Sequence, residues 1–517
     1  AWHLGPQFTQ LAAARDRVGA KAKKVLIAHL DTGFDPDHAT VPPNIRADLQ
    51  HNFIDRNHPK DARDRTPPGN SPFRNPGHGP GTLSILAGAK LPPGAPGWNG
   101  FSDYIGAAPH AQIMPVRVAN WVVQFTTESL AQGINHARHS EAHVLSMSLG
   151  GLSSEILVDA VNAAYDAGVF MVAAAGNSYA DRPVPSTIVF PARLKRVLAA
   201  CGVMANGASY SGLAGGTMQG NFGPSEKMPT AMGAYSPNIL WAQMGCPTTV
   251  DLNGAGTSSV TPQLAAAAAL WMAEHFEALD AYPEPWMRIE AARVALFGSA
   301  ARRTALMGEL ETIEKAGNGV LRALDALDIR PPDAAHLRKL PPAQPTWSWL
   351  NLLFGGGVTL APELSRSPAG RKMLTLELTQ IAQRIREVDE AIDDPDRPDD
   401  QIPSSAKNRY LEAALDYGNP SKPLKAFLET LVGRPGVQGA ALADRPVVQR
   451  EIRAMPVPKR RLRVYALDPS VAQSNDFFEV REATLSVPWD DVPETEEKLR
   501  PGPIGEYLEV IDVDPAS

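Results

Sequence analysis

Short apolar runs alternate with helical patterns through the first two hundred residues, and this alternation limits the possible folds more than any other feature of the chain. We expect buried strands over residues 25–30, 111–118, 143–151, 169–177 and 196–203. Between them, residues 127–139 and 155–167 carry the apolar spacing of helices. Strands that are apolar along their whole length are typical of parallel sheets covered on both faces. The pattern therefore predicts an α/β fold, a mostly parallel sheet with helices on both faces.

The chain of 517 residues is too long for one compact core, and its composition changes at several points. We expect an N-terminal lead-in over residues 1–24 and the α/β domain over 25–328. Within that domain, residues 204–240 predict an irregular surface insertion, and helices resume from Gln263. A proline-rich linker is expected over 329–345.

The last region, residues 346–517, predicts a separate α+β accessory domain, with helices over about 370–432 and strands over about 460–512. Its first helix is expected over residues 370–392, with an apolar stripe made of Leu374, Leu378, Ile381, Ile385 and Val388. We interpret this region as a module that recruits a partner protein or the substrate.

Composition excludes several classes of protein. The net charge of −7 gives no attraction to nucleic acid, and no apolar run is long enough to span a membrane. Two cysteines exclude a disulfide scaffold, and we expect Cys201 and Cys246 to be buried free thiols, with a single bridge as the alternative. No leader pattern opens the chain, so we expect a cytoplasmic protein, with secretion after removal of a leader as the alternative.

Three polar residues occupy positions suited to nucleophilic catalysis. Ser258 stands among small residues just before a long apolar helix pattern, so helix N-terminal amides would point toward the charge that develops in acyl transfer. Asp31 follows the strand at 25–30, at the end of a strand where α/β sheets carry their sites. His78 lies in a glycine turn before another apolar helix pattern. The neighbouring Ser259 would face elsewhere at a helix start.

These residues follow one another in the order Asp, His, Ser, which is the order of subtilisin among the convergent serine triads. The chain resembles the subtilisin-like serine peptidases (subtilases) over about residues 20–328. Five stretches carry the resemblance: Asp31-Thr32-Gly33, Gly77-His78-Gly79, Ser146-Met147-Ser148-Leu149-Gly150, Ala174-Ala175-Gly176-Asn177 and Gly256-Thr257-Ser258-Ser259-Val260-Thr261-Pro262. The segment Gly317-Asn318-Gly319-Val320-Leu321 resembles the glycine-containing end of such a domain.

The resemblance implies a serine endopeptidase that works through an acyl-enzyme. Ser258 would attack the scissile carbonyl, and His78 would take its proton and later deliver it to the leaving amine. Asp31 would hold the imidazole in the productive tautomer. Asn177, together with the Ser258 backbone N–H, would form the oxyanion hole.

The resemblance also implies how a protein or peptide substrate would bind. Ser148, Leu149 and Gly150 would pair with it as an extended strand, and Ala173, Ala174 and Ala175 would form the opposite wall of the first specificity pocket. These small apolar walls favour an apolar residue on the acyl side of the scissile bond. No cofactor or catalytic metal is expected. Whether the chain binds a structural calcium ion is left open, because the spacing of the acidic and amide residues does not identify a set of ligands.

Some residues depart from the usual subtilase pattern, and other functions stay open. Pro80 stands where many relatives have threonine, and Cys246-Pro247-Thr248-Thr249 replaces the usual small-residue approach to the serine. An aspartic peptidase is disfavoured because it needs two paired carboxylates, and the chain has a single Asp-Thr-Gly. The alternatives are a catalytically silent or latent peptide-binding protein with this fold, and a processing peptidase dedicated to one partner.

Overall fold

The computed structural model describes residues 1–66, 75–91, 103–124, 127–179, 185–213, 217–344, 403–432 and most of 374–391, with three strands within 460–512. The chain forms two compact units, Ala1–Ala440 and Ala441–Ser517. Residues 346–373, the first part of the predicted accessory domain, lie outside the described residues.

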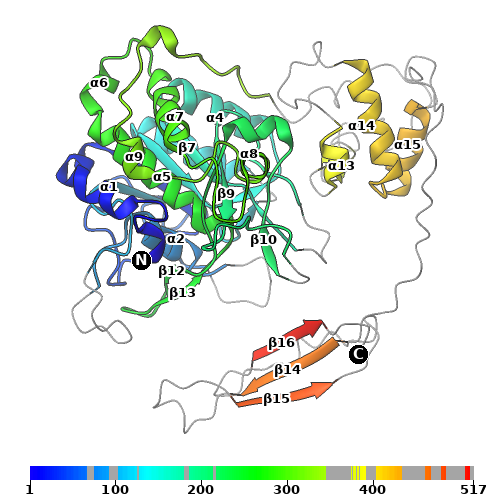
Figure 1. Cartoon of the computed structure of the whole chain (residues 1–517), viewed down its shortest axis with the longest axis horizontal. Helices are drawn as coiled ribbons and strands as arrows, with labels where there is room; N and C mark the ends of the chain where they lie inside the picture. The colour runs from blue at the N-terminus through cyan, green and yellow to red at the C-terminus, as the bar shows by residue number, and fades with distance from the viewer. Residues whose placement is uncertain are drawn as a thin grey trace. The chain divides into compact units, whose positions relative to one another are not determined.

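A seven-stranded sheet forms the centre of the first unit (Figure 1). Its strands are β1 (Leu26–Asp31), β2 (His51–Asn52), β3 (Gln112–Arg117), β5 (Val144–Met147), β7 (Phe170–Ala174), β9 (Leu198–Val203) and β11 (Ala231–Tyr235). They lie in the order β11-β9-β7-β5-β1-β3-β2, and every neighbouring pair is parallel. The predicted parallel sheet is confirmed, and its central strands are buried as their apolar sequences require.

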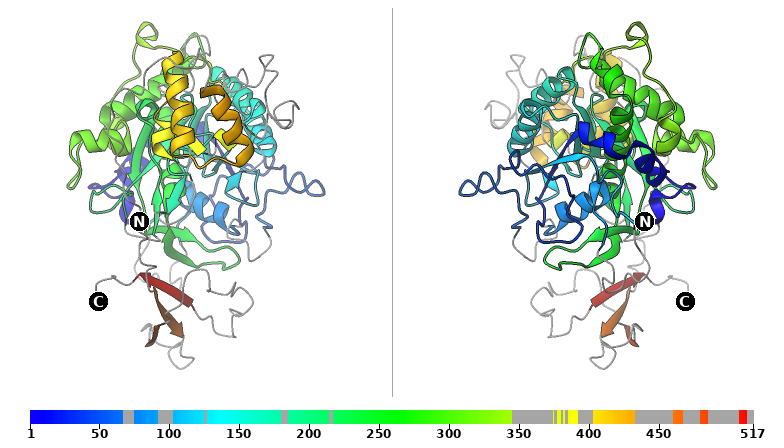
Figure 2. Two further views of the ribbon diagram at one scale, coloured as in Figure 1. Left: turned by 90° about the vertical axis from the view of Figure 1, so that its right-hand side faces the viewer. Right: turned by 90° about the vertical axis from the view of Figure 1, so that its left-hand side faces the viewer.

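Helices cover both faces of this sheet (Figure 2). The helices α2 (His78–Ala87) and α5 (Gly256–Glu274) pack against each other, and α5 also packs on β5, β7 and β9. The helices α3 (Glu128–His139) and α4 (Glu155–Asp166) form a second packed pair. The Ser154 hydroxyl caps α4 by accepting a hydrogen bond from Leu157 N. The predicted helices at 127–139 and 155–167 are therefore confirmed.

The helix α5 begins at Gly256, seven residues before the predicted start at Gln263. It is buried almost completely, and its run of alanines from Ala265 to Ala269 lets the helix lie close to the strands. Because the helix starts this early, Ser258 lies in its first turn rather than in a preceding loop.

The prediction of a surface insertion over residues 204–240 is wrong. This stretch contributes β11 to the main sheet, where all five of its residues are buried. It also contains η3 (Ser225–Thr230), β10 (Met218–Gly220), which pairs with β8 (Asn177–Tyr179), and β12 (Ile239–Ala242), which pairs with β13 (Val250–Gly254). Because β11 consists largely of alanine, glycine and methionine, its sequence does not have the β-branched composition typical of a strand. Packing explains the glycine, since a Cβ on Gly233 would lie 2.9 Å from the Ala316 side chain.

The N-terminal segment closes onto the end of the α/β region. It forms η1 (Trp2–Leu4), α1 (Leu11–Val18) and η2 (Gly19–Lys24), and α1 packs on α5 and α9 (Ala323–Ala326). Ala323 N donates to Thr9 O at 2.8 Å, and Gln10 Nε2 donates to Asp325 Oδ1 at 3.1 Å. The other helical segments are α6 (Phe276–Asp280), α7 (Met287–Ser299), α8 (Glu309–Ala316) and η4 (Ala334–His336).

The described end of the predicted proline-rich linker is packed on the first unit. Arg196 donates from Nε to Pro341 O and from Nη2 to Leu340 O, both at 2.9 Å. Asn162 exchanges two side-chain hydrogen bonds of 2.9 Å with the backbone of Ala343. These contacts make residues 340–343 part of the folded surface rather than a free tether.

The helices that follow form a core of their own within the first unit. They include α13 (Arg386–Asp389), α14 (Ser404–Asp416) and α15 (Lys422–Val432), and their core contains Leu374, Leu378, Ile381, Val388, Tyr410 and Phe427. Four residues of the predicted apolar stripe are thus buried and Ile385 is partly buried, but the single helix expected over 370–392 is wrong. Ile385 is extended, with φ −116° and ψ 107°, so α13 is a separate turn of helix.

The second unit contains an antiparallel three-stranded sheet in the order β15-β14-β16. Its strands are β14 (Arg460–Ala466), β15 (Glu479–Thr484) and β16 (Tyr507–Asp512), at the positions predicted for strands.

Both cysteines are free thiols. Cys201 is buried, and burial raises its pKa to about 12, whereas Cys246 is exposed, contrary to expectation. Among the described residues, no helix is long and apolar enough to cross a membrane.

Candidate active site

Asp31 and His78 come together where β1 ends and α2 begins. His78 Nδ1 lies 2.8 Å from Asp31 Oδ1, and Asp31 is fully buried. Two glycines allow this approach, because a Cβ on Gly79 would lie 2.0 Å from Gly33 O. Gly33 itself has φ +121°, a conformation that favours glycine. The glycines of the two sequence motifs therefore bring the carboxylate and the imidazole within bonding distance.

The second carboxylate oxygen of Asp31 is held by a threonine that the sequence analysis did not select. The Thr82 hydroxyl donates to Asp31 Oδ2 at 3.0 Å, its nearest acceptor oxygen. His29 Nε2 lies 2.8 Å from the same hydroxyl, so it donates to Thr82 and its proton is assigned to Nε2. A continuous hydrogen-bonded chain thus runs from His29 through Thr82 and Asp31 to His78.

Burial and charge act in opposite directions on this chain. Burial raises the pKa of Asp31, but the interaction with His78, by charge and by hydrogen bond, and the hydrogen bond from Thr32 N outweigh it, so the pKa is lowered. Burial lowers the pKa of His29 to about 4, so this ring is neutral at neutral pH. The carboxylate stays ionised beside a neutral histidine and the His78 imidazole.

A second network positions the start of α2. Thr32 Oγ1 accepts from Gly79 N at 2.9 Å and donates to Asp64 Oδ2 at 2.6 Å. Asp64 Oδ2 also accepts from Gly77 N at 2.9 Å. The indole of Trp241 meets the His78 ring edge-on, with centroids 5.5 Å apart. Asp64 and Trp241 were not anticipated, because no local sequence pattern links them to His78.

Ser258 lies in the first turn of α5 and is 7% exposed. Pro262 has no N–H to donate to the Ser258 carbonyl, which instead accepts from Ser148 Oγ at 3.0 Å. In return, Ser258 Oγ lies 3.5 Å from Ser148 O, and the hydrogen bonds of the described residues include none between Ser258 and His78. By contrast, Ser259 Oγ donates to Ala255 O within its own helix.

Asn177 packs against the turn that leads into Ser258. Its Oδ1 accepts from Thr257 N at 2.8 Å, which assigns the amide nitrogen to the other position. Gly256 has φ +69°, and a Cβ there would lie 2.9 Å from the Asn177 side chain. The glycine therefore lets the amide approach the backbone just before the serine.

The predicted substrate-binding residues lie at the ends of two neighbouring strands: Ser148, Leu149 and Gly150 directly follow β5, Ala173 and Ala174 end β7, and Ala175 follows it. The edge at Gly150 is already paired, because β6 (Gly150–Gly151) forms a parallel bridge with β4 (Val123–Gln124) and Gly150 N donates to Val122 O at 3.0 Å. Val189 lies between the two predicted walls. Its methyl groups would be 2.3 Å from a Cβ on Gly150 and 3.0 Å from a Cβ on Gly176.

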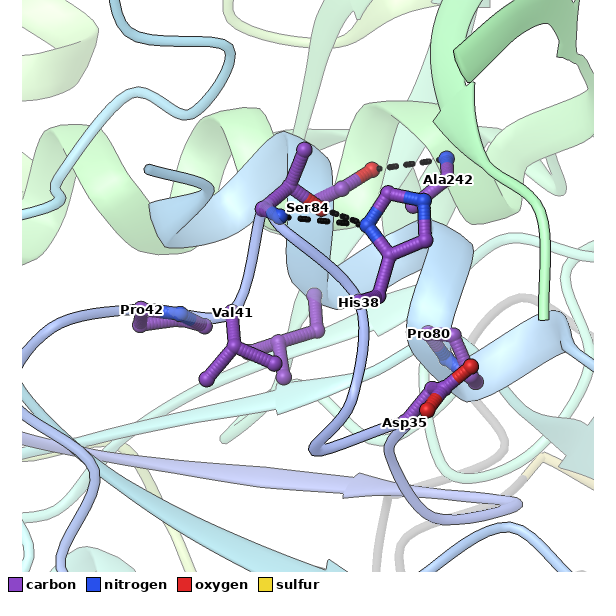
Figure 3. Close-up of a pocket in the computed structure, with 9 residues that line it drawn as sticks. Asp35, His38, Val41, Pro42, Pro80, Ser84 and Ala242 are labelled. Atoms are coloured by element: carbon purple, nitrogen blue, oxygen red, sulfur yellow. Dashed lines mark hydrogen bonds between the residues drawn. The ribbon is translucent and has the colours of Figure 1, made fainter. Parts of the chain in front are cut away.

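A small pocket beside the start of α2 is lined by Asp35, His38, Pro80 and Ser84 (Figure 3). His38 Nδ1 bonds Thr40 Oγ1, and Nε2 bonds Thr249 O. Asp35 accepts from Gly245 N at 2.8 Å. These groups hold loops together, and no group of three or more His, Cys, Asp or Glu side chains in the described residues is placed to bind a metal ion.

The sequence of this chain is similar to that of known proteins. The family model described as the subtilase family matches residues 22–311. Thermitase of Thermoactinomyces vulgaris is 28% identical over 52% of this chain and 80% of its own length. Subtilisin BL of Lederbergia lenta is 32% identical over 36% of this chain and 70% of its own. The cell wall-associated protease of Bacillus subtilis is 31% identical over 49% of this chain, which spans only 24% of that protein.

Two solved structures were also matched. The protease domain of PatA shares 22% identity, covers 59% of this chain and 94% of its own, and superposes with a TM-score of 0.43. The prenylagaramide maturation protease PagA shares 20% identity, covers 62% of this chain and 97% of its own, and superposes with a TM-score of 0.44.

Proposed function

The chain belongs to the subtilase family, and from this we propose that it is a serine endopeptidase in which Asp31, His78 and Ser258 form the catalytic triad. The observation that carries the proposal is the buried 2.8 Å contact between His78 Nδ1 and Asp31 Oδ1 at the start of α2, a helix that packs on α5, which carries Ser258 in its first turn. A contact with this carboxylate orients the ring and leaves Nε2 to accept a proton.

In the proposed reaction, Ser258 Oγ attacks the scissile carbonyl carbon while its proton passes to His78 Nε2. Asp31 stabilises the imidazolium that results. The negative oxygen of the tetrahedral intermediate accepts hydrogen bonds from Asn177 Nδ2 and Ser258 N. Collapse of the intermediate breaks the C–N bond, and His78 returns the proton to the leaving amine. Water then attacks the acyl-enzyme by the same route and regenerates Ser258.

The proposed substrate is a protein or peptide segment in extended form. It would bind along Ser148–Gly150 by adding a strand, with an apolar side chain between this edge and Ala173–Ala175. Because Gly150 N is bonded to Val122 O, the substrate must displace β4 from this edge before it can pair. We propose that this chemistry needs no cofactor, so chelation of metal ions should leave the rate of the chemical step unchanged.

A latent form of the same peptidase is the second candidate. Two observations favour it: the edge at Gly150 is occupied, and Ser258 Oγ lies 3.5 Å from Ser148 O without a bond to His78. Catalytic hydrogen bonds often tighten only when substrate is bound, so the active and latent proposals share one site.

A fluorophosphonate probe followed by peptide mapping tests the proposal. We expect the label on Ser258, and we expect Ser258→Ala and His78→Ala to abolish it while Ser259→Ala retains it. A folded protein that stays unlabelled alone but reacts after addition of an extended peptide would be latent. Absence of label under both conditions would refute the peptidase proposal.

A further inference from the structure

Residues 186–193 form the link between the two predicted walls of the first specificity pocket. Val189 N donates to Ala175 O at 3.0 Å, on the wall that follows β7. The next residue, Phe190, bridges Gly151, with Gly151 N donating to Phe190 O at 2.8 Å. Because the Val189 side chain also lies between Gly150 and Gly176, any displacement of this link changes the base of the pocket.

The end of the link is held by the helices that follow the α/β region. Arg193 N donates to Val189 O at 2.8 Å, so the backbone of Arg193 is bonded directly to that of Val189. The Arg193 guanidinium donates from Nη1 and Nη2 to the two carboxylate oxygens of Asp389, each at 2.6 Å. Arg193 is 2% exposed and Asp389 is 0% exposed. This is a bidentate ion pair shielded from water, whose planar geometry fixes direction as well as distance.

A second residue of α13 holds the beginning of the link. Arg386 donates from Nη2 to Ser186 O and from Nη1 to Phe222 O, both at 3.1 Å. Its guanidinium also lies 3.9 Å from the centroid of the Phe222 ring. Gly223 has φ +72°, a conformation that favours glycine, and a Cβ there would lie 2.6 Å from Arg386 Nη1 and push the guanidinium away. Gly223 O in turn accepts from Ile188 N at 3.0 Å.

The two contacts depend on the break in the helix at Ile385. An unbroken helix through this residue would not carry α13 in its present direction, and α13 is only four residues long. Arg386 and Asp389 are three residues apart and therefore share one side of the turn. One short helix thus contacts both ends of residues 186–193.

From these contacts we propose that α13 is a positioning element for the first specificity pocket, and that Arg386 and Asp389 fix residues 186–193 and so determine which side chain the pocket accepts. This inference rests on the proposed peptidase function. The helices after residue 373 are then part of the catalytic unit rather than only a recruitment module. Arg386 and Asp389 act through Val189 and do not touch the reacting atoms.

The test uses the full chain and three variants. Asp389→Asn keeps the size of the side chain but leaves Arg193 buried without its anionic partner. Arg386→Met removes the donors to Ser186 O and Phe222 O at a partly exposed site, where loss of folding is of less concern. Glu429→Gln is the matched control, because it removes one charge from an exposed pair with Lys425 on α15.

Cleavage is measured on peptides that differ only in the residue on the acyl side of the scissile bond, from glycine to alanine, leucine and phenylalanine. Active sites are counted with a fluorophosphonate, so unfolded molecules do not contribute. We expect Asp389→Asn and Arg386→Met to change the ratio of kcat/KM for phenylalanine and glycine at least fivefold, mainly through KM. Glu429→Gln should keep that ratio within twofold of the parent.

Hydrogen exchange at the amides of residues 187–193 supplies a readout that needs no activity. The inference requires faster exchange there in Asp389→Asn and Arg386→Met than in Glu429→Gln. Unchanged exchange, or an unchanged kcat/KM ratio in both variants, would overturn it. If the parent chain takes no fluorophosphonate either alone or after addition of an extended peptide, the peptidase proposal fails, and the exchange data alone decide whether α13 holds the link.

Discussion

The two sides of the candidate active site differ in how completely their polar atoms are bonded. On the acid–imidazole side, both oxygens of Asp31 accept hydrogen bonds, and the turn before His78 is tied to Thr32 and Asp64. On the serine side, the hydroxyl of Ser258 makes a long contact of 3.5 Å with Ser148 O, and the neighbouring Gly150 N–H is bonded to Val122 O.

The difference indicates which step is prepared before the substrate arrives. In the proposed mechanism, the orientation of the His78 base is built into the fold, because its tautomer depends on buried protein groups. The alignment of the Ser258 nucleophile is then left to the substrate, which must displace β4 and approach this serine. The predictions below test whether the two sides contribute unequally and by separate mechanisms.

The largest effect is expected for Asp31→Asn. The asparagine cannot hold His78 in the tautomer that leaves Nε2 free to accept a proton, and we expect kcat to fall about 10⁴-fold, the size seen for this change in other triads. The exposed Asp37→Asn is the control and should retain full activity. A fall in kcat of less than tenfold would mean that Asp31 does not control the tautomer of His78.

The serine side is tested by Asn177→Asp. The carboxylate keeps the acceptor for Thr257 N but lacks the amide donor, so the local backbone is preserved while oxyanion stabilisation is lost. We expect kcat to fall about 10²- to 10³-fold with a small change in KM. Asn253→Asp, at an exposed site before the serine, controls for added charge. An unchanged kcat would place the oxyanion elsewhere.

Replacing Thr82 with valine removes one donor from the Asp31 carboxylate without changing the side-chain shape. One hydrogen bond to a charged group suggests a loss of about tenfold in kcat/KM. Thr82→Ser keeps the hydroxyl and should recover most of the activity. Equal activity in the valine and serine variants would remove Thr82 from the functional network.

His29 makes the stability of the acid–imidazole side depend on pH. Between pH 6.5 and about 4 the unfolded chain binds a proton at His29 that the folded chain does not, so stability falls on acidification, by up to about 1.4 kcal/mol per pH unit. Asp31 has a lowered pKa, so its own contribution is lost only below this range, as pH falls through the folded value. The free energy of unfolding, measured with urea at several pH values from 7 to 5, should fall less steeply with acidification in His29→Gln than in the parent. In the exposed control His139→Gln, this pH dependence should equal that of the parent.

The smallest effect is expected for Ser259→Ala. Its hydroxyl is bonded to Ala255 O, so kcat/KM should change less than twofold, in contrast to Ser258→Ala. A large loss in this variant would show that the two serines were assigned in the wrong order.

Much of the fold could be predicted from the sequence because its strands are apolar throughout and separated by helical spacing. β11 could not, since its alanines and glycine have low strand propensity and its pairing with β9 decides the outcome. In the site, Asp31, His78 and Ser258 follow from motifs and chain order. Two residues that were missed did carry a signal: Thr82 is four residues after His78 on α2, and His29 is two before Asp31 on β1, so each shares a face with the motif residue.

Asp64 and Trp241 illustrate what local reasoning leaves out. Trp241 meets the His78 ring from a segment far along the chain, Asp64 bonds Gly77 N from 13 residues earlier, and neither has a motif that connects it to the histidine. The same holds for Asp389, whose partner Arg193 lies 196 residues earlier in the chain. Such contacts follow only from the packing of distant segments.

The closure of the N-terminal segment onto α9 has a consequence for biosynthesis. Thr9 and Gln10 bond Ala323 and Asp325, so these two residues meet their partners only after more than three hundred further residues have been made. Asp389 follows Arg193 by 196 residues in the chain. Contacts this far apart in sequence slow folding and prolong the exposure of apolar strands. The α/β region therefore stays incomplete during synthesis until residues 323–325 have been made, and residues 186–193 gain their contacts with Arg386 and Asp389 only after α13 follows.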